Sequence, residues 1–139
     1  MGDVREPFVV PLKRIPNEKG DILHAMKRSE RGFRGFGEAY FTTVRHGVIK
    51  GWKRHRKMTL NLVVPVGAVR FVVHDDRTGE FHDFRLSEDN YGRLNVPPGL
   101  WVAFRGLDEG LNLILNIADL EHDPAEAESV ELEKIEYEW

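Results

Sequence analysis

Residues 45–57 read RHGVIKGWKRHRK, and this stretch decides how the rest of the chain is interpreted. It contains six Lys or Arg and two of the six His, and no Asp or Glu occurs between Glu38 and Asp75. The flanking residues 40–44 and 60–64 are rich in β-branched and aromatic side chains, which is typical of strands. The pattern predicts a rigid cationic wall, suited to holding a phosphate-bearing small molecule.

The length and charge of the chain narrow the possible functions. Its 139 residues predict one domain over 1–139, with an N-terminal arm (1–36), a barrel (37–118) and an acidic tail (119–139). The net charge of -3 argues against a dedicated nucleic-acid binder. The absence of Cys excludes disulfides and thiolate chemistry and fits a cytoplasmic protein. No apolar run is long enough to span a bilayer, so we expect no membrane partner.

Short apolar segments alternate with Gly, Pro and Asp turns along most of the sequence. Such regular spacing indicates an all-β sandwich or barrel. The segments lie at residues 8–10, 40–44, 60–64, 68–74, 81–86, 91–96, 100–104 and 111–117. One short N-terminal helix is predicted after Asp21, which could cap it, because Ile22, Leu23 and Met26 would share a face.

Several motifs together resemble the cupins of the dTDP-4-dehydrorhamnose 3,5-epimerase type, from about residue 37 to residue 139. The family strand R-G-V-L-R-G-L-H resembles residues 45–53, and the ending resembles residues 135–139. The G-x-V…D-x-R and I-P-x-G patterns are similar to residues 67–69, 75–77 and 96–99. The resemblance implies an antiparallel jelly-roll barrel that binds a nucleotide-linked 4-keto-6-deoxy sugar. It also implies a homodimer, with residues 8–10 free to pair across it.

The chain departs from the epimerase pattern at both catalytic positions. Lys53 stands where the epimerases have their basic His, and residues 113–115 contain no Tyr where the family places its acid. General acid–base catalysis needs a group that titrates near the working pH, and an ordinary Lys titrates at about 10.4. The related sugar-nucleotide 3,4-ketoisomerases carry R-G-x-H-A-H here, and His55 matches the second His of that motif.

Two functions therefore remain open. The first is an isomerase, either an epimerase or a ketoisomerase, with His55 as the base and Lys53 stabilising the enolate oxygen. Both side chains should lie on one side of their strand, because they are two residues apart. The second is a non-catalytic nucleotide-sugar-binding or structural cupin, in which His55 is structural and the basic residues form a solvated face.

Further residues are candidates for substrate binding. Lys50, Arg45 and Arg77 could contact the diphosphate. Trp101, like Tyr40 and Trp52, could stack on a base or sugar, although aromatic residues in strands are more often core. Asn61 and Asn116 lie in apolar strands and need a polar partner, which could be a ligand hydroxyl or a neighbouring loop.

No metal site or other cofactor is predicted. Many cupins hold a metal through two His, a Glu and a later His, and of the first cluster this chain keeps only His55. Val102 stands where the later His would be. Three protein ligands are the usual minimum of a catalytic metal site.

Overall fold

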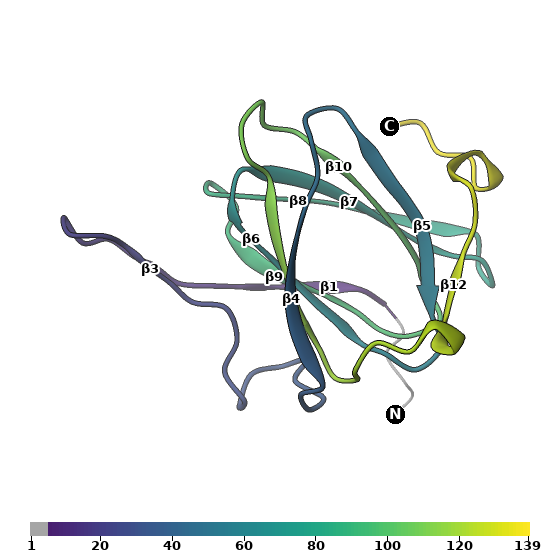
Figure 1. The fold of residues 1–139 in the computed structure, drawn as a ribbon, viewed down its shortest axis with the longest axis horizontal. Coiled ribbons are helices and arrows are strands. Elements are labelled where there is room, and N and C mark those ends of the chain that lie inside the picture. The colour runs from purple at the N-terminus through teal and green to yellow at the C-terminus, as the bar shows by residue number, and fades with distance from the viewer. Residues whose placement is uncertain (1–5) are drawn as a thin grey trace.

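The computed structural model describes residues 6–139, and these residues form an all-β fold (Figure 1). Residues 1–5, the start of the predicted N-terminal arm, lie outside the description. No helix in the described part of the chain is long and apolar enough to cross a membrane. The strands are β1 (Phe8–Pro11), β2 (Arg14–Ile15), β3 (Ile22–Leu23), β4 (Glu38–Thr43), β5 (Ile49–His55), β6 (Leu60–Val66), β7 (Ala68–Asp75), β8 (Glu80–Ser87), β9 (Gly92–Val96), β10 (Trp101–Gly106), β11 (Leu113–Ala118) and β12 (Ala127–Ser129).

Ten of these strands form two five-stranded sheets. The first has the order β1-β9-β6-β11-β4 and the second has the order β12-β5-β10-β7-β8. Each strand pairs with its neighbours in antiparallel fashion. The all-β, antiparallel prediction is therefore confirmed. Strand β1 pairs with β9 of the same chain and lies at the edge of the first sheet, so pairing of residues 8–10 across a dimer stays a prediction.

The main core lies between the two sheets. Strand alternation explains its composition, because successive side chains of a strand point to opposite faces. In β7, Val69, Phe71 and Val73 are fully buried in this core, whereas Val72 points to the outer face. An apolar residue on an outer face needs a cover, and the C-terminal segment supplies it.

The acidic C-terminal segment is docked on the outside of the second sheet. Trp52, Val72 and Trp101 form a second apolar cluster. The residues that pack on this cluster are Val130, Leu132, Ile135, Tyr137 and Trp139. Strand β12 also pairs with β5, and the Trp52 indole donates a hydrogen bond of 3.1 Å to the Leu132 carbonyl. Figure 1 shows this segment running alongside β5.

The predicted N-terminal helix is wrong. Residues 21–26 contain β3, which pairs with β2 in a hairpin that projects from the body of the molecule (Figure 1). The Asp21 carboxylate accepts the Asn17 backbone N–H at 3.0 Å, so it closes the hairpin turn instead of capping a helix. Gly20, with φ of 134°, permits that turn. So few residues gain too little from helix formation to compete with strand pairing.

Three buried polar side chains hold the loop that precedes β4. Arg93, which is completely buried, donates to the Ala25 carbonyl at 3.0 Å and to the Arg31 carbonyl at 2.7 Å. Asn61 and Asn95 both donate to the backbone carbonyl of residue 32, at 3.3 and 3.1 Å. Every one of these contacts crosses from the barrel to the loop. Arg93, Asn61 and Asn95 therefore form a buried clamp that fixes the loop against the first sheet.

Candidate functional site

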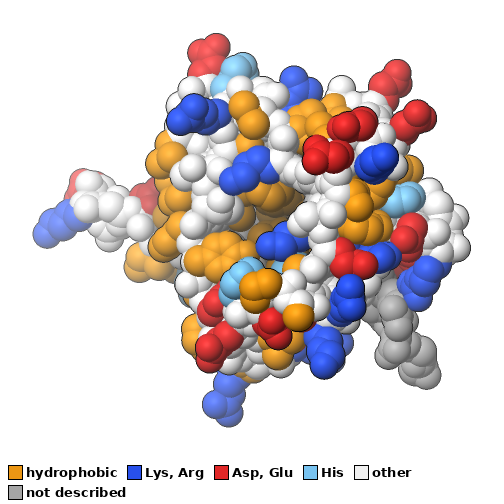
Figure 2. Space-filling view, turned by 45° about the vertical axis from the view of Figure 1, so that its right-hand side comes forward, with side chains coloured by type: hydrophobic (Ala, Val, Ile, Leu, Met, Phe, Trp, Pro, Cys, Tyr) orange, Lys and Arg blue, Asp and Glu red, His pale blue; other side chains and the backbone are white. Residues whose placement is uncertain are grey.

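A pocket of about 320 Å³ opens between the edges of the two sheets, next to β4 and β5. Figure 2 shows a hollow on this side of the molecule, with hydrophobic side chains inside it and Lys or Arg side chains at its rim. Its residues come from six strands and include Tyr40, Thr42, Lys50, Lys53, His55, Leu60, Leu62, Val102, Phe104, Ile114, Asn116 and Ser129. The pocket therefore combines an apolar wall with a few polar groups, which is typical of small-molecule sites.

His55 is the most strongly positioned polar group in this pocket. Its Nδ1 lies 2.7 Å from a carboxylate oxygen of Glu126, and both side chains are more than nine-tenths buried. Glu126 belongs to the 3-10 helix η1 (Pro124–Glu126), which Asp123 caps. Because a carboxylate only accepts, neutral His55 carries its proton on Nδ1 and its lone pair on Nε2. That is the tautomer of a general base held by a second residue.

Glu126 stays ionised because of the same contacts. Burial opposes ionisation and would raise the pKa of Glu126, but hydrogen bonds from His55 and from the Lys57 and Met58 backbone N–H groups outweigh it. The pKa of Glu126 is therefore lowered in the folded protein. The carboxylate thus accepts three hydrogen bonds and fixes both the ring and the loop after β5.

We expect Glu126→Gln to make the unfolding free energy of the protein less dependent on acid pH. A carboxylate with a lowered folded pKa adds stability above its unfolded pKa of about 4.3, and this stability is lost as pH falls through the folded pKa. The unfolding free energy of the variant, measured in urea at pH 7 and pH 3.5, should fall less than that of wild type. Glu121→Gln, an exposed change of the same charge, is the control. Equal acid sensitivity of Glu126→Gln and wild type would contradict this role.

The two pocket lysines differ in how they are held. The Lys50 ammonium donates to the Thr42 hydroxyl at 3.3 Å and to the Thr43 carbonyl at 3.1 Å. Lys53 is exposed, and its side chain has no hydrogen bond or ion pair among the described residues. No Asp or Glu is among the residues that line the pocket. Both ammonium groups are thus available to an anionic or carbonyl oxygen.

Tyr40 enters the pocket from β4, directly opposite Asn116 on β11. The Asn116 side-chain oxygen accepts the Asn61 backbone N–H at 3.2 Å, so its amide nitrogen faces Tyr40 and donates to the phenol oxygen at 3.1 Å. The Tyr40 proton is consequently free for another acceptor in the pocket. The sequence shows Tyr40 only as a stacking or core candidate, because the register that pairs β4 with β11 is not readable from it.

The structure brings four of the eight candidate residues together in this pocket, namely Lys50, Lys53, His55 and Asn116. The others lie elsewhere. Asn61 belongs to the buried clamp on the N-terminal loop, and Trp101 lies beneath the C-terminal segment. Arg45 is exposed outside the pocket, and Arg77 forms an ion pair of 3.0 Å with Asp75. Within residues 6–139, no three His, Asp or Glu side chains are grouped closely enough to bind a metal ion.

The chain is similar in sequence and fold to several known proteins. No protein-family model matches the chain. A dTDP sugar isomerase from Desulfovibrio desulfuricans G20 is 33% identical, with a TM-score of 0.92 over 98% of this chain and 92% of that one. A dTDP-4-dehydrorhamnose 3,5-epimerase from Sulfolobus tokodaii has a TM-score of 0.81 at 20% identity, over 94% and 80% of the two chains. The spore coat polysaccharide biosynthesis protein SpsL of Bacillus subtilis (strain 168) is 26% identical over 121 residues, which are 84% of this chain and 80% of SpsL.

Proposed function

The chain belongs to the cupin family of dTDP-sugar isomerases and epimerases, and from this we propose that it binds a nucleotide-linked 4-keto-6-deoxy sugar and moves a proton next to the ketone. The contact between His55 and Glu126 carries the proposal. A buried His that a carboxylate holds with Nε2 unprotonated is arranged to remove a proton. Lys53, which stands at the position of the epimerase base, would not by itself support an enzymatic function, because an ordinary Lys is a poor general base near neutral pH.

The proposed reaction assigns one task to each polar group in the pocket. His55 Nε2 takes the proton from the carbon beside the ketone, and the C–H electron pair forms the enolate. The Lys53 ammonium stabilises the negative charge on the enolate oxygen. Tyr40, on the other sheet, returns a proton to the enolate, and the Asn116 amide then hydrogen-bonds to the phenolate. Lys50 holds the diphosphate. Whether the product is an epimer or a keto isomer depends on the carbon that is reprotonated.

Hydrogen exchange with the solvent tests the activity. The protein is incubated with dTDP-4-keto-6-deoxyglucose in heavy water, and carbon-bound deuterium in the recovered sugar is measured by mass spectrometry. We expect deuterium to appear at enzymatic rates, because removal and return of the proton pass through groups that exchange with water. A sugar that stays unlabelled while saturating the protein would contradict the proposed isomerase.

The second candidate function is nucleotide-sugar binding without turnover. The observation that favours it is Lys53, an exposed cation at the position of the epimerase base. This function predicts saturable binding that salt weakens, because screening reduces the attraction between exposed charges. It excludes exchange at enzymatic rates, so the deuterium experiment separates the two functions.

We expect Lys53→Met to weaken binding of a dTDP-sugar by about 1.5–3 kcal/mol, the range for hydrogen bonds to charged groups. Lys53→Arg should preserve much of the binding, because it keeps the positive charge. The dissociation constants are measured by calorimetry at low salt. Unchanged affinity of Lys53→Met would place the sugar nucleotide outside this pocket.

A further inference from the structure

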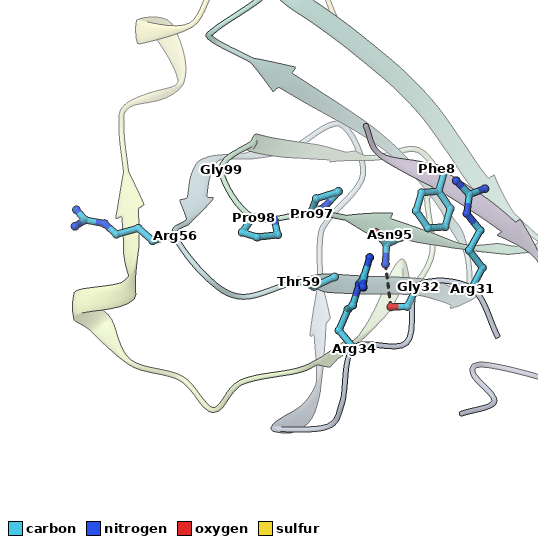
Figure 3. Close-up of a pocket in the computed structure, with 10 residues that line it drawn as sticks. All are labelled: Phe8, Arg31, Gly32, Arg34, Arg56, Thr59, Asn95, Pro97, Pro98 and Gly99. Atoms are coloured by element: carbon cyan, nitrogen blue, oxygen red, sulfur yellow. Dashed lines mark hydrogen bonds between the residues drawn. The ribbon is translucent and has the colours of Figure 1, made fainter. Parts of the chain in front are cut away.

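A second recess, of about 440 Å³, lies beyond the C-terminal end of β5 and shares no lining residue with the pocket between the sheets. Three arginines, Arg31, Arg34 and Arg56, line it, and Figure 3 shows Arg34 between them, extending toward Pro97 and Pro98. Arg31 stands beside Phe8, and Arg56 points outward at the opposite end. Arg31 and Arg34 are therefore the cations best placed to act inside the recess.

The positive charge of this recess is largely uncompensated. No Asp or Glu lines it, although the chain as a whole has a net charge of -3. Arg34 has no ion pair or hydrogen bond to its side chain among residues 6–139. The Arg31 guanidinium lies 3.7 Å from the centre of the Phe8 ring, a stacked position that leaves its N–H edges free. Arg56 reaches Glu128 only at 3.4 Å, with 59% of its side chain exposed.

The loop that carries Arg31 and Arg34 is already ordered. Buried Arg93 donates to the Arg31 carbonyl at 2.7 Å, and buried Asn95 donates to the residue 32 carbonyl at 3.1 Å. Figure 3 shows the Asn95 contact at the base of the recess. A site ordered in advance loses less conformational entropy when it binds. The buried clamp thus fixes the backbone from which Arg31 and Arg34 extend.

We propose that this recess binds the phosphoryl group of a small molecule, as a second site separate from the pocket between the sheets. Planar guanidinium groups bind phosphate oxygens through paired N–H donors, which suits the free edges of Arg31 and Arg34. Pro97 and Pro98 offer an apolar wall to whatever group carries the phosphate. Inorganic phosphates and nucleotide diphosphates share this chemistry, so the test includes both.

The test follows backbone amide signals of the full-length protein in ¹H–¹⁵N NMR spectra during titration with inorganic pyrophosphate or dTDP. We expect saturable shifts of the Gly32 and Gly35 amides, and a dissociation constant about tenfold weaker in Arg34→Gln. Arg28→Gln, an exposed arginine of the same loop outside the recess, is the matched control and should bind as wild type does.

The outcomes distinguish the possible ligands. Shifts with both anions assign the site to the phosphoryl group alone, whereas shifts with dTDP only assign it to a nucleotide that also contacts the proline wall. No saturable shift at these amides, or equal affinity of Arg34→Gln and wild type, overturns the proposal. A response to RNA but to neither small anion overturns it as well. Because these amides lie outside the pocket with His55, the result does not depend on the isomerase proposal.

Discussion

His55→Asn lowers the rate of solvent exchange into the keto sugar by about 10²–10⁴-fold, the range that a general base contributes. The side chain of Asn can still accept a hydrogen bond or donate one to Glu126, but it cannot take a proton near neutral pH. Binding of the dTDP-sugar should change little, because Lys50 and Lys53 remain. The loss should thus fall on kcat rather than on the dissociation constant, a pattern expected of a group that acts in the transition state.

His46→Asn is the matched control for this prediction. His46 also lies in the basic stretch, but its ring contacts the Leu107 carbonyl at 3.2 Å and is outside the pocket. Its replacement should leave the exchange rate near that of wild type. Full exchange by His55→Asn would remove His55 as the base. An equal loss in both variants would point to a general effect on the fold.

Arg93→Met destabilises the protein by about 2–6 kcal/mol, because it leaves two loop carbonyls without their buried donor, and each unsatisfied acceptor costs about 1–3 kcal/mol. The guanidinium lies 3.1 Å from Glu30 and donates to the Ala25 and Arg31 carbonyls, all in the N-terminal loop. Met fills similar space but satisfies none of these acceptors. Unfolding in urea should show a lower midpoint, and hydrogen exchange should increase in residues 25–34.

Arg85→Met makes the same chemical change at an exposed position of β8. Substitutions on the surface, away from buried contacts, usually change stability by no more than about 0.5 kcal/mol. We therefore expect the unfolding midpoint of Arg85→Met to stay close to that of wild type. If Arg93→Met were equally mild, the clamp would not be what orders the loop.

The strands were predictable because their signals are local. Residues 60–64 and 68–74 are rich in β-branched side chains and are bounded by turn residues, which predicts strands. They form β6 and β7. The prediction of a helix after Asp21 is wrong because the deciding contact is not local. Its apolar spacing fits a helix, but the partner that decides its conformation, β2, lies across a turn. Short apolar segments cannot be assigned from periodicity alone.

The pocket residues predicted from the sequence come from β5, except Asn116 of β11, a polar residue in an apolar strand. Lys53 and His55 follow from alternation along β5, because they are two residues apart. Lys50 is three residues before Lys53, and it joins them where the pairing of β5 with β10 is irregular. Glu126 and Tyr40 come from other segments, and their approach to the pocket depends on how η1 and β4 pack. Glu126 lies in an acidic tail where nothing distinguishes it from the neighbouring carboxylates. Contacts between distant segments need the fold before they can be found.

The separation between His55 and Glu126 has a consequence for biosynthesis. The two partners are 71 residues apart in the chain. At about 5–20 residues per second, a ribosome needs roughly 4–14 s to add that length. The nascent strand β5 therefore emerges with its histidine unpaired and its outer face uncovered. Most strands of the barrel are synthesised before the carboxylate that orients the ring, so the order of synthesis makes assembly of the pocket one of the late events of folding.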